Sequence, residues 1–335
     1  MKQFLATFAV IALVMAPLAL AGDYHTGSTL ICSDCHIMHA SQAHGYNADG
    51  SGNYAAYDAT PHEYLLRNSP NALCLSCHDG QNWAPDVLYT NTNSDVRAAG
   101  ALNMPGFGLD PTGHTLGSTD VAPGGTWSNA QGLECVDCHQ QHGYNPNGGN
   151  PYRNLHYSPG GAYAYPGIIV DYAVGTNDLT KDVYEVTDTG PNHYSWDNVF
   201  YNEPDSYGSD YVRFCGGCHT NFHGLPGDAN MGGATGTEWL RHPVSGADIG
   251  AQGGGHSSLA VFQGHTNQVK VMSASGDWTG ANNDLTPSCM SCHKAHGNQN
   301  AFALIFMSGT GTVTEEGDDG TQARDLCNQC HVQGN

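Results

Sequence analysis

The stretch Cys32-Ser-Asp-Cys35-His36 is the first of six copies of one five-residue frame, C-x-x-C-H, and these copies decide the fold. The other copies span 74–78, 135–139, 215–219, 289–293 and 327–331, and the six together use all 12 cysteines of the chain. Two thiols at this spacing reach the two vinyl groups of one porphyrin, and the histidine that follows ligates its iron. The sequence therefore predicts six covalently attached haems c.

Each predicted haem takes two cysteines and one histidine from its own motif. The attachment residues are Cys32, Cys35, Cys74, Cys77, Cys135, Cys138, Cys215, Cys218, Cys289, Cys292, Cys327 and Cys330. The proximal iron ligands are His36, His78, His139, His219, His293 and His331. Disulfides are a poor alternative, because chance pairing would not place a histidine after all six second cysteines. Structural zinc sites also use C-x-x-C pairs, but each metal needs two such half-sites.

The ligands on the opposite face of each iron must also come from histidine. The chain holds 19 histidines, and the six proximal ones leave 13. The first, third and fifth motifs continue as C-x-x-C-H-x-x-H and so add His39, His142 and His296. A histidine three residues after the proximal ligand cannot reach the far face of the same iron, but it can reach a neighbouring haem. We therefore expect three pairs of successive haems, in which each of these histidines serves the partner haem.

The other three distal ligands are expected from the segments between the pairs. His25 precedes the first pair, His114 the second, and His242 and His265 the third. His223, after the fourth motif, competes with His242 and His265 for one place. The remaining histidines are expected at the surface or behind the ligands; they are His44, His62, His156, His193 and His256.

Two strong axial ligands on every iron leave no position for a substrate, so the pattern favours an electron carrier over an enzyme. A multihaem reductase, for example of oxidised nitrogen or sulfur compounds, is the minor alternative. It needs at least one open or unusual axial position, and nothing in the six motifs requires one.

Composition indicates how such a chain folds. It has 44 glycines and only 39% hydrophobic residues, so aliphatic side chains alone make a poor core. Six flat apolar porphyrins can supply the missing buried surface. We expect mostly coil with short helices and little strand, wrapped around a chain of six stacked haems, with one hairpin around 168–186. No boundary stands out, so 22–335 is expected to be a single haem-threaded unit.

Charge and the first residues indicate where the protein works. The formal net charge is -21, which disfavours nucleic acid and anionic lipid as partners. Lys2, the apolar run 4–15, Pro17 and the small residues 19–21 have the order of a secretory signal peptide. We expect cleavage after Ala21 and a secreted chain without a membrane span, at the cell surface or beyond it.

Several short segments resemble the hexahaem outer-surface cytochromes of Geobacter-type metal reducers, a family that forms extracellular cytochrome nanowires. The resemblance is patchy but runs from end to end, with six haem motifs in the same order. The segments are Tyr24-His25-Thr26-Gly27, 32–39, Gly113-His114, 122–126, 215–220, Leu240-Arg241-His242-Pro243 and 326–331.

This resemblance implies a filament of copies of the chain, in which stacked bis-histidine haems make a continuous electron path. It implies that His25 ligates the haem at His293 of a neighbouring copy, and that His114 and His242 serve the first and third haems. Upstream outer-membrane or periplasmic cytochromes would deliver electrons, and a metal oxide, an electrode or a partner cell would accept them. The alternative is a monomeric periplasmic or cell-surface shuttle, in which His25 binds within its own chain.

Overall fold

The computed structural model describes residues 25, 30–37, 62–81, 84, 86–88, 99–102, 113–142, 154–156, 159–160, 171–172, 199–200, 214–219, 249, 271–273, 285–287, 289–297, 300–305 and 324–331. All 12 cysteines and all six proximal histidines fall within these ranges. The expected signal peptide at 1–21 lies outside them.

Short helices form at the haem motifs. Helices α2 (Cys32–Cys35), α4 (Cys135–Cys138) and α7 (Cys289–Cys292) each enclose the two cysteines of a motif. Helix α8 (Arg324–Cys327) ends on the first cysteine of the last motif, and α3 (Pro70–His78) contains the whole second motif. In five motifs the histidine N–H donates to the carbonyl of the first cysteine at 2.9 Å. This one-turn bond gives both thiols and the imidazole a fixed relative direction.

Local side chains explain why turns this short persist. Asp34 and Asp137 accept hydrogen bonds from the backbone N–H groups of Ile31 and Glu134, both at 2.8 Å, and so close the start of α2 and α4. A carboxylate in the first turn also faces the positive end of the helix. Helix α3 is longer and has Pro70 in its first turn, where a missing N–H costs nothing.

Strands are short. Strand β1 (Asp171–Tyr172) pairs antiparallel with β2 (Val199–Phe200), and β3 (Val271–Ser273) pairs antiparallel with β4 (Leu285–Pro287). Two 3-10 turns, η1 (Glu63–Leu65) and η5 (Ala301–Ala303), complete the described elements. The hairpin expected within 168–186 is wrong in its partner, because Tyr172 pairs with Val199 beyond that range.

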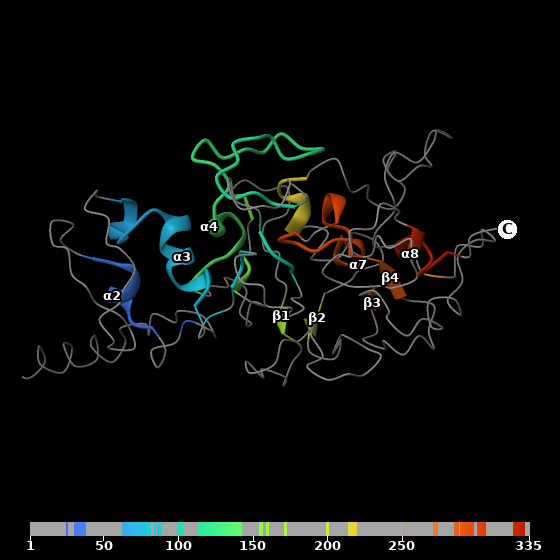
Figure 1. Ribbon diagram of the computed structural model, residues 1–335, viewed down its shortest axis with the longest axis horizontal. Coiled ribbons are helices and arrows are strands. Elements are labelled where there is room, and N and C mark those ends of the chain that lie inside the picture. Colours follow the sequence, from blue (N-terminus) through green and yellow to red (C-terminus); the bar gives the residue numbers. More distant parts are fainter. Residues whose placement is uncertain are drawn as a thin grey trace, which may run out of the picture.

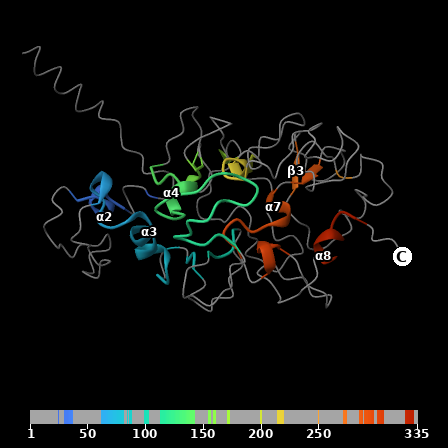
Figure 2. The same cartoon turned by 90° about the horizontal axis from the view of Figure 1, so that it is seen from above.

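The haem motifs follow one another along the long axis of the molecule. In Figure 1 helices α2, α3 and α4 come first, then the turn over 214–216, then α7 and α8. The view from above in Figure 2 shows the same succession. Sequence order is therefore also spatial order, as expected for a chain threaded along a row of cofactors.

The described protein core is small. Its buried apolar side chains are scattered along the chain and include only four aliphatic side chains with less than 5% exposure, those of Leu88, Ala101, Leu116 and Ile305. The expected fold class, coil with short helices and little strand, is confirmed. Within the described ranges no helix combines the length and the apolar character needed to cross a bilayer.

Candidate haem centres

Four pairs of histidine rings face one another in the described part of the chain. The ring centroids of His36 and His142 lie 6.0 Å apart, and those of the other pairs lie 6.1 Å apart. In every pair one ring is the histidine of a C-x-x-C-H motif. The other three pairs are His25 with His78, His114 with His219, and His139 with His296.

This separation fits one metal ion between two imidazoles. A metal–nitrogen bond to imidazole is about 2 Å long, and the ring centre lies about 1 Å behind that nitrogen, so the two centres lie about 6 Å apart. Simple aromatic contacts cover about 4.5 to 7 Å, so distance alone does not decide. The deciding feature is that all four pairs contain the histidine of a haem motif. These residues fit haem iron with two axial imidazoles.

Backbone carbonyls fix the proton on the outer nitrogen of several of these rings. His36 Nδ1 donates to the Tyr64 carbonyl at 2.9 Å, and His293 Nδ1 donates to the Phe302 carbonyl at 2.8 Å. His219 Nδ1 donates in the same way to the Pro123 carbonyl at 2.8 Å. A proton held on Nδ1 leaves the Nε2 lone pair free to bind a metal.

His114 and His25, which lie outside the haem motifs, have environments that favour the neutral imidazole. His114 Nδ1 donates to the carbonyl of Ala295 at 2.5 Å. Burial lowers the pKa of His114, and the neighbouring His219 lowers it further. Burial likewise lowers the pKa of His25, followed by the effect of His78. Neutral imidazole is the form that coordinates metal, so both environments suit an axial ligand.

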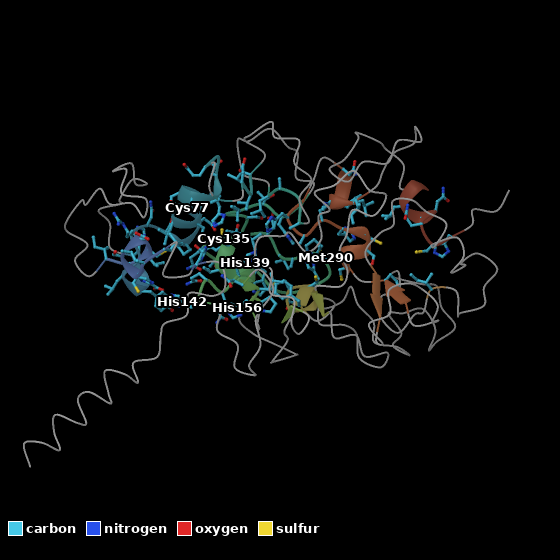
Figure 3. The ribbon with its side chains drawn as sticks, turned by 90° about the horizontal axis from the view of Figure 1, so that it is seen from below. Cys77, Cys135, His139, His142, His156 and Met290 are labelled. Carbon is cyan, nitrogen blue, oxygen red and sulfur yellow. The ribbon has the colours of Figure 1, made fainter. Side chains whose placement is uncertain are left out.

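The first three motifs are in mutual contact. Burial and the nearby thiols of Cys74 and Cys77 raise the pKa of Cys35 to about 11, which joins the first motif to the second. A thiol–thiol hydrogen bond from the second motif to the third, between Cys74 and Cys135, raises the pKa of Cys74. Helices α3 and α4, which carry these residues, pack together; Figure 3 labels Cys77 and Cys135 on them.

The succession of neighbouring motifs continues through the last three. Burial raises the pKa of Cys138, and the fourth-motif thiols of Cys218 and Cys215 add to that shift. His114 is close enough to both His219 and His293 for each to lower its pKa, which brings the fourth and fifth motifs together. Burial and the sixth-motif thiols raise the pKa of Cys292 to about 12. The six motifs thus form one continuous row in sequence order.

The structure corrects the expected use of the histidines three residues after a motif. His142 was expected to serve the fourth motif and His296 the sixth. Instead His142 faces His36 of the first motif, and His296 faces His139 of the third. Each ring therefore reaches back to the preceding odd-numbered motif. In the structure these two rings therefore lie beside motifs other than the expected ones.

The expectations for His25 and His114 are corrected as well. His25 was expected to reach His293 of a neighbouring copy, but it lies against His78 of its own chain. His114 was expected at the first haem, but it faces His219 of the fourth motif. In the structure each of these rings therefore lies beside a motif other than the expected one.

Of the lesser candidates, two lie in described segments. His62 is half-buried at the start of η1, and His156 is half-buried with its backbone N–H bonded to Cys138. The other candidates lie outside the described residues; they are His39, His44, His193, His223, His242, His256 and His265.

A crossing of three glycine-bearing segments holds His114 and His296 together, a feature that the sequence did not reveal. His114 N–H donates to the His296 carbonyl at 3.0 Å, and Ala101 N–H donates to the Gly297 carbonyl at 2.8 Å. Gly100 and Gly297 pair as a parallel bridge and both have positive φ, +75° and +136°. Two histidines that face different motifs are thus fixed to one backbone junction.

Comparison with known proteins bears on the haem motifs. The doubled CXXCH motif family matches residues 284–335, which contain the fifth and sixth motifs. These motifs are of the kind that holds haem c, and the chain resembles multihaem c-type cytochromes.

It is a homologue of the C-type cytochrome OmcS of Geobacter sulfurreducens, to which it is 25% identical over 364 residues, or 88% of this chain and 82% of OmcS. The resemblance seen in the sequence is thereby confirmed. A solved structure, the outer membrane cytochrome S filament from Geobacter sulfurreducens, aligns with 92% of this chain and 96% of its own at 18% identity and a TM-score of 0.48.

Proposed function

We propose that the protein carries six haems c, each with two histidine ligands, and passes electrons along this row as one segment of an extracellular filament. The observation that carries the proposal is the continuous succession of motifs with opposed histidine pairs. Haem iron supplies the one-electron chemistry. The chain's own residues hold the irons in sequence, close both axial positions and keep neighbouring sites in contact. We number the haems by their motifs.

The distal ligands follow two rules, of which the first concerns the odd-numbered haems. His142 of the third motif serves haem 1, and His296 of the fifth motif serves haem 3. Each odd motif thus lends its second histidine to the odd haem before it. His39 of the first motif has no earlier odd haem in its chain, while haem 5 has no later odd motif. The rule is completed if His39 of one copy serves haem 5 of the next.

The second rule concerns the even-numbered haems. His25 precedes the first pair and serves haem 2, and His114 precedes the second pair and serves haem 4. The third pair is preceded by His242 and His265. Threonine follows His25, His114 and His265, whereas proline follows His242. We therefore assign haem 6 to His265 and leave His242, like His223, out of the ligand set.

A ligand shared between copies explains why the chain would polymerise. Electron tunnelling falls steeply with distance, so a long path needs close haems at every boundary. If a histidine of one copy ligates a haem of the next, that haem becomes fully coordinated only when the two copies associate. We place the filament outside the cell, fed by outer-membrane or periplasmic cytochromes and discharging to a metal oxide, an electrode or a partner cell.

The position of His25 also supports a second candidate, a monomeric shuttle. A shuttle completes its haems within one chain, and His25 facing His78 is what it requires. The two functions differ at haem 5. In a monomer the second axial ligand of haem 5 must come from the same chain, whereas in the filament it comes from a second copy.

The haem content and the spin state of the purified protein test the proposal. Mass spectrometry should show six haems per chain, and the ferric and ferrous spectra should be low-spin throughout the filament. Carbon monoxide should bind no haem of the filament, because both axial positions are taken. A high-spin haem in the assembled protein would favour a reductase instead.

Replacing His142 with alanine tests the first rule. We expect six attached haems, of which one, haem 1, becomes high-spin and binds carbon monoxide, because His36 loses the ring that faces it at 6.0 Å. Carbon monoxide difference spectra and mass spectrometry measure both quantities. His156→Ala is the matched control, since we assign no iron to His156, and it should bind no carbon monoxide. A fully low-spin His142→Ala protein would remove His142 from the ligand set.

Replacing His265 and His242 in separate variants tests the second rule. His265→Ala should open one haem to carbon monoxide, and His242→Ala should leave all six low-spin. Magnetic circular dichroism counts the low-spin haems directly. If the results are reversed, threonine after the histidine has no bearing on which residue ligates haem 6.

A further inference from the structure

The three odd motifs share one backbone arrangement. After each odd motif the chain returns and pairs a leucine with the proximal histidine in an isolated antiparallel bridge. The pairs are His36 with Leu66, His139 with Leu155, and His293 with Leu304.

Two hydrogen bonds, one on each side of the bridge, repeat in all three motifs as well. The residue after the proximal histidine donates to the residue before the leucine, and the residue after the leucine donates back to the second cysteine. The first set joins Ile37 to Leu65 at 2.7 Å, Gln140 to Asn154 at 2.6 Å, and Lys294 to Ala303 at 2.8 Å. The second joins Arg67 to Cys35 at 2.9 Å, His156 to Cys138 at 2.8 Å, and Ile305 to Cys292 at 2.9 Å.

The returning segment is strained at the same place each time. Every described residue other than glycine with a positive φ lies one or two positions before one of these leucines. They are Tyr64 at 58°, Leu65 at 59°, Asn154 at 53°, Phe302 at 59° and Ala303 at 55°. A left-handed conformation is unfavourable for residues that carry a Cβ, least so for asparagine. A cost that recurs in three segments of different sequence indicates that the conformation has a use.

In the first and fifth motifs the left-handed conformation positions a hydrogen-bond acceptor for the proximal histidine. The left-handed turn aims the carbonyl of its first residue at the proximal ring, so that Tyr64 accepts from His36 Nδ1 at 2.9 Å and Phe302 accepts from His293 Nδ1 at 2.8 Å. A right-handed turn would aim these carbonyls elsewhere. A carbonyl acceptor on Nδ1 fixes the plane of the ring and strengthens the nitrogen that faces the iron as a donor.

We propose that Tyr64 and Phe302 are positioning residues, whose left-handed turns orient the proximal imidazoles of haems 1 and 5 and lower the reduction potentials of these two haems. The proposal rests on the proposed function, because it concerns haems held by two histidines. A stronger imidazole donor stabilises ferric over ferrous iron, so the carbonyl bond shifts the potential downward. The turn thereby tunes the first and fifth steps of the electron path.

The test is Tyr64→Pro in the full haem-loaded protein, because proline fixes φ near about −65° and forbids the left-handed turn. We expect six attached haems, one of which has a more positive potential and a changed low-spin electron paramagnetic resonance signal. Tyr64→Gly is the matched control, since glycine adopts positive φ freely and keeps the carbonyl in place. Phe302→Pro and Phe302→Gly should repeat the contrast at a different single haem.

If Tyr64→Pro does not accumulate with six haems, Tyr64→Val gives the same information, because a branched side chain opposes positive φ without closing a ring. It should shift the same haem in the same direction by less. Unchanged potentials and resonance signals in the proline or valine variant, or equal shifts in Tyr64→Gly, would overturn the positioning role. Wild-type protein without low-spin haems would instead overturn the proposed function, so the two failures are distinguishable.

Discussion

Replacing His39 with alanine is expected to abolish filament growth and leave all six haems attached. The reason is the register of the odd motifs, in which His142 faces His36 and His296 faces His139. We propose that the same register puts His39 on haem 5 of the adjoining copy. Negative-stain electron microscopy of material sheared from cells measures filament length, and carbon monoxide binding to the dispersed protein should reveal haem 5 as open.

His25→Ala is the matched comparison, because His25 faces His78 of its own chain. It should open haem 2 to carbon monoxide and leave filaments of normal length. His44→Ala removes a histidine to which we assign no iron, and it should change neither quantity. Normal filaments in His39→Ala, or their loss in His25→Ala, would contradict the assignment of the shared ligand.

Replacing Gly100 with alanine is expected to destabilise the holoprotein by about 3 kcal/mol or more, a size that only severe packing conflicts reach. An added Cβ at Gly100 would overlap the Gly297 carbonyl oxygen, and φ is +75° there. This is the crossing that fixes His114 and His296, so haems 3 and 4 should lose distal ligands together. Denaturant titration followed by haem absorbance gives the stability, and carbon monoxide binding gives the number of open haems.

Gly117→Ala separates the packing conflict from backbone strain. Gly117 has a similar φ of +78°, but a Cβ there would meet nothing within 4 Å. Its cost should be about 1 kcal/mol, the usual penalty for a side chain at positive φ, with no haem opened. Equal effects of Gly100→Ala and Gly117→Ala would show that strain, and not the crossing, decides the outcome.

The attachment sites and the fold class could be predicted from the sequence because their determinants are local. C-x-x-C-H contains everything that a haem c needs on its proximal side. High glycine with few aliphatic residues also indicated a fold held by cofactors, and the small described core agrees.

The pairing of distal histidines could not be predicted in the same way. The spacing predicted that His142 and His296 would lie beside another motif, but spacing alone does not say beside which motif. That depends on contacts between segments far apart in sequence, such as the one between His114 and His296. The same holds for His25, because the ring beside it, that of His78, is far away in the sequence.

The left-handed turns and the glycine crossing escaped prediction for another reason. Nothing in Glu63-Tyr64-Leu65 or Ala301-Phe302-Ala303 signals positive φ, because neither segment contains glycine or asparagine. Gly100, Gly113 and Gly297 are three of 44 glycines, and only their meeting in space distinguishes them. Repetition of one geometry in three motifs made the turns recognisable.

The most direct test of the central claim is an electron cryo-microscopy reconstruction of the native protein sheared from cells. We expect filaments with six haems per chain in motif order, His36 opposite His142, His139 opposite His296, and His39 of each copy on haem 5 of the next. Dispersed particles with haem 5 completed inside one chain would contradict the filament, and haems out of motif order would contradict the row itself.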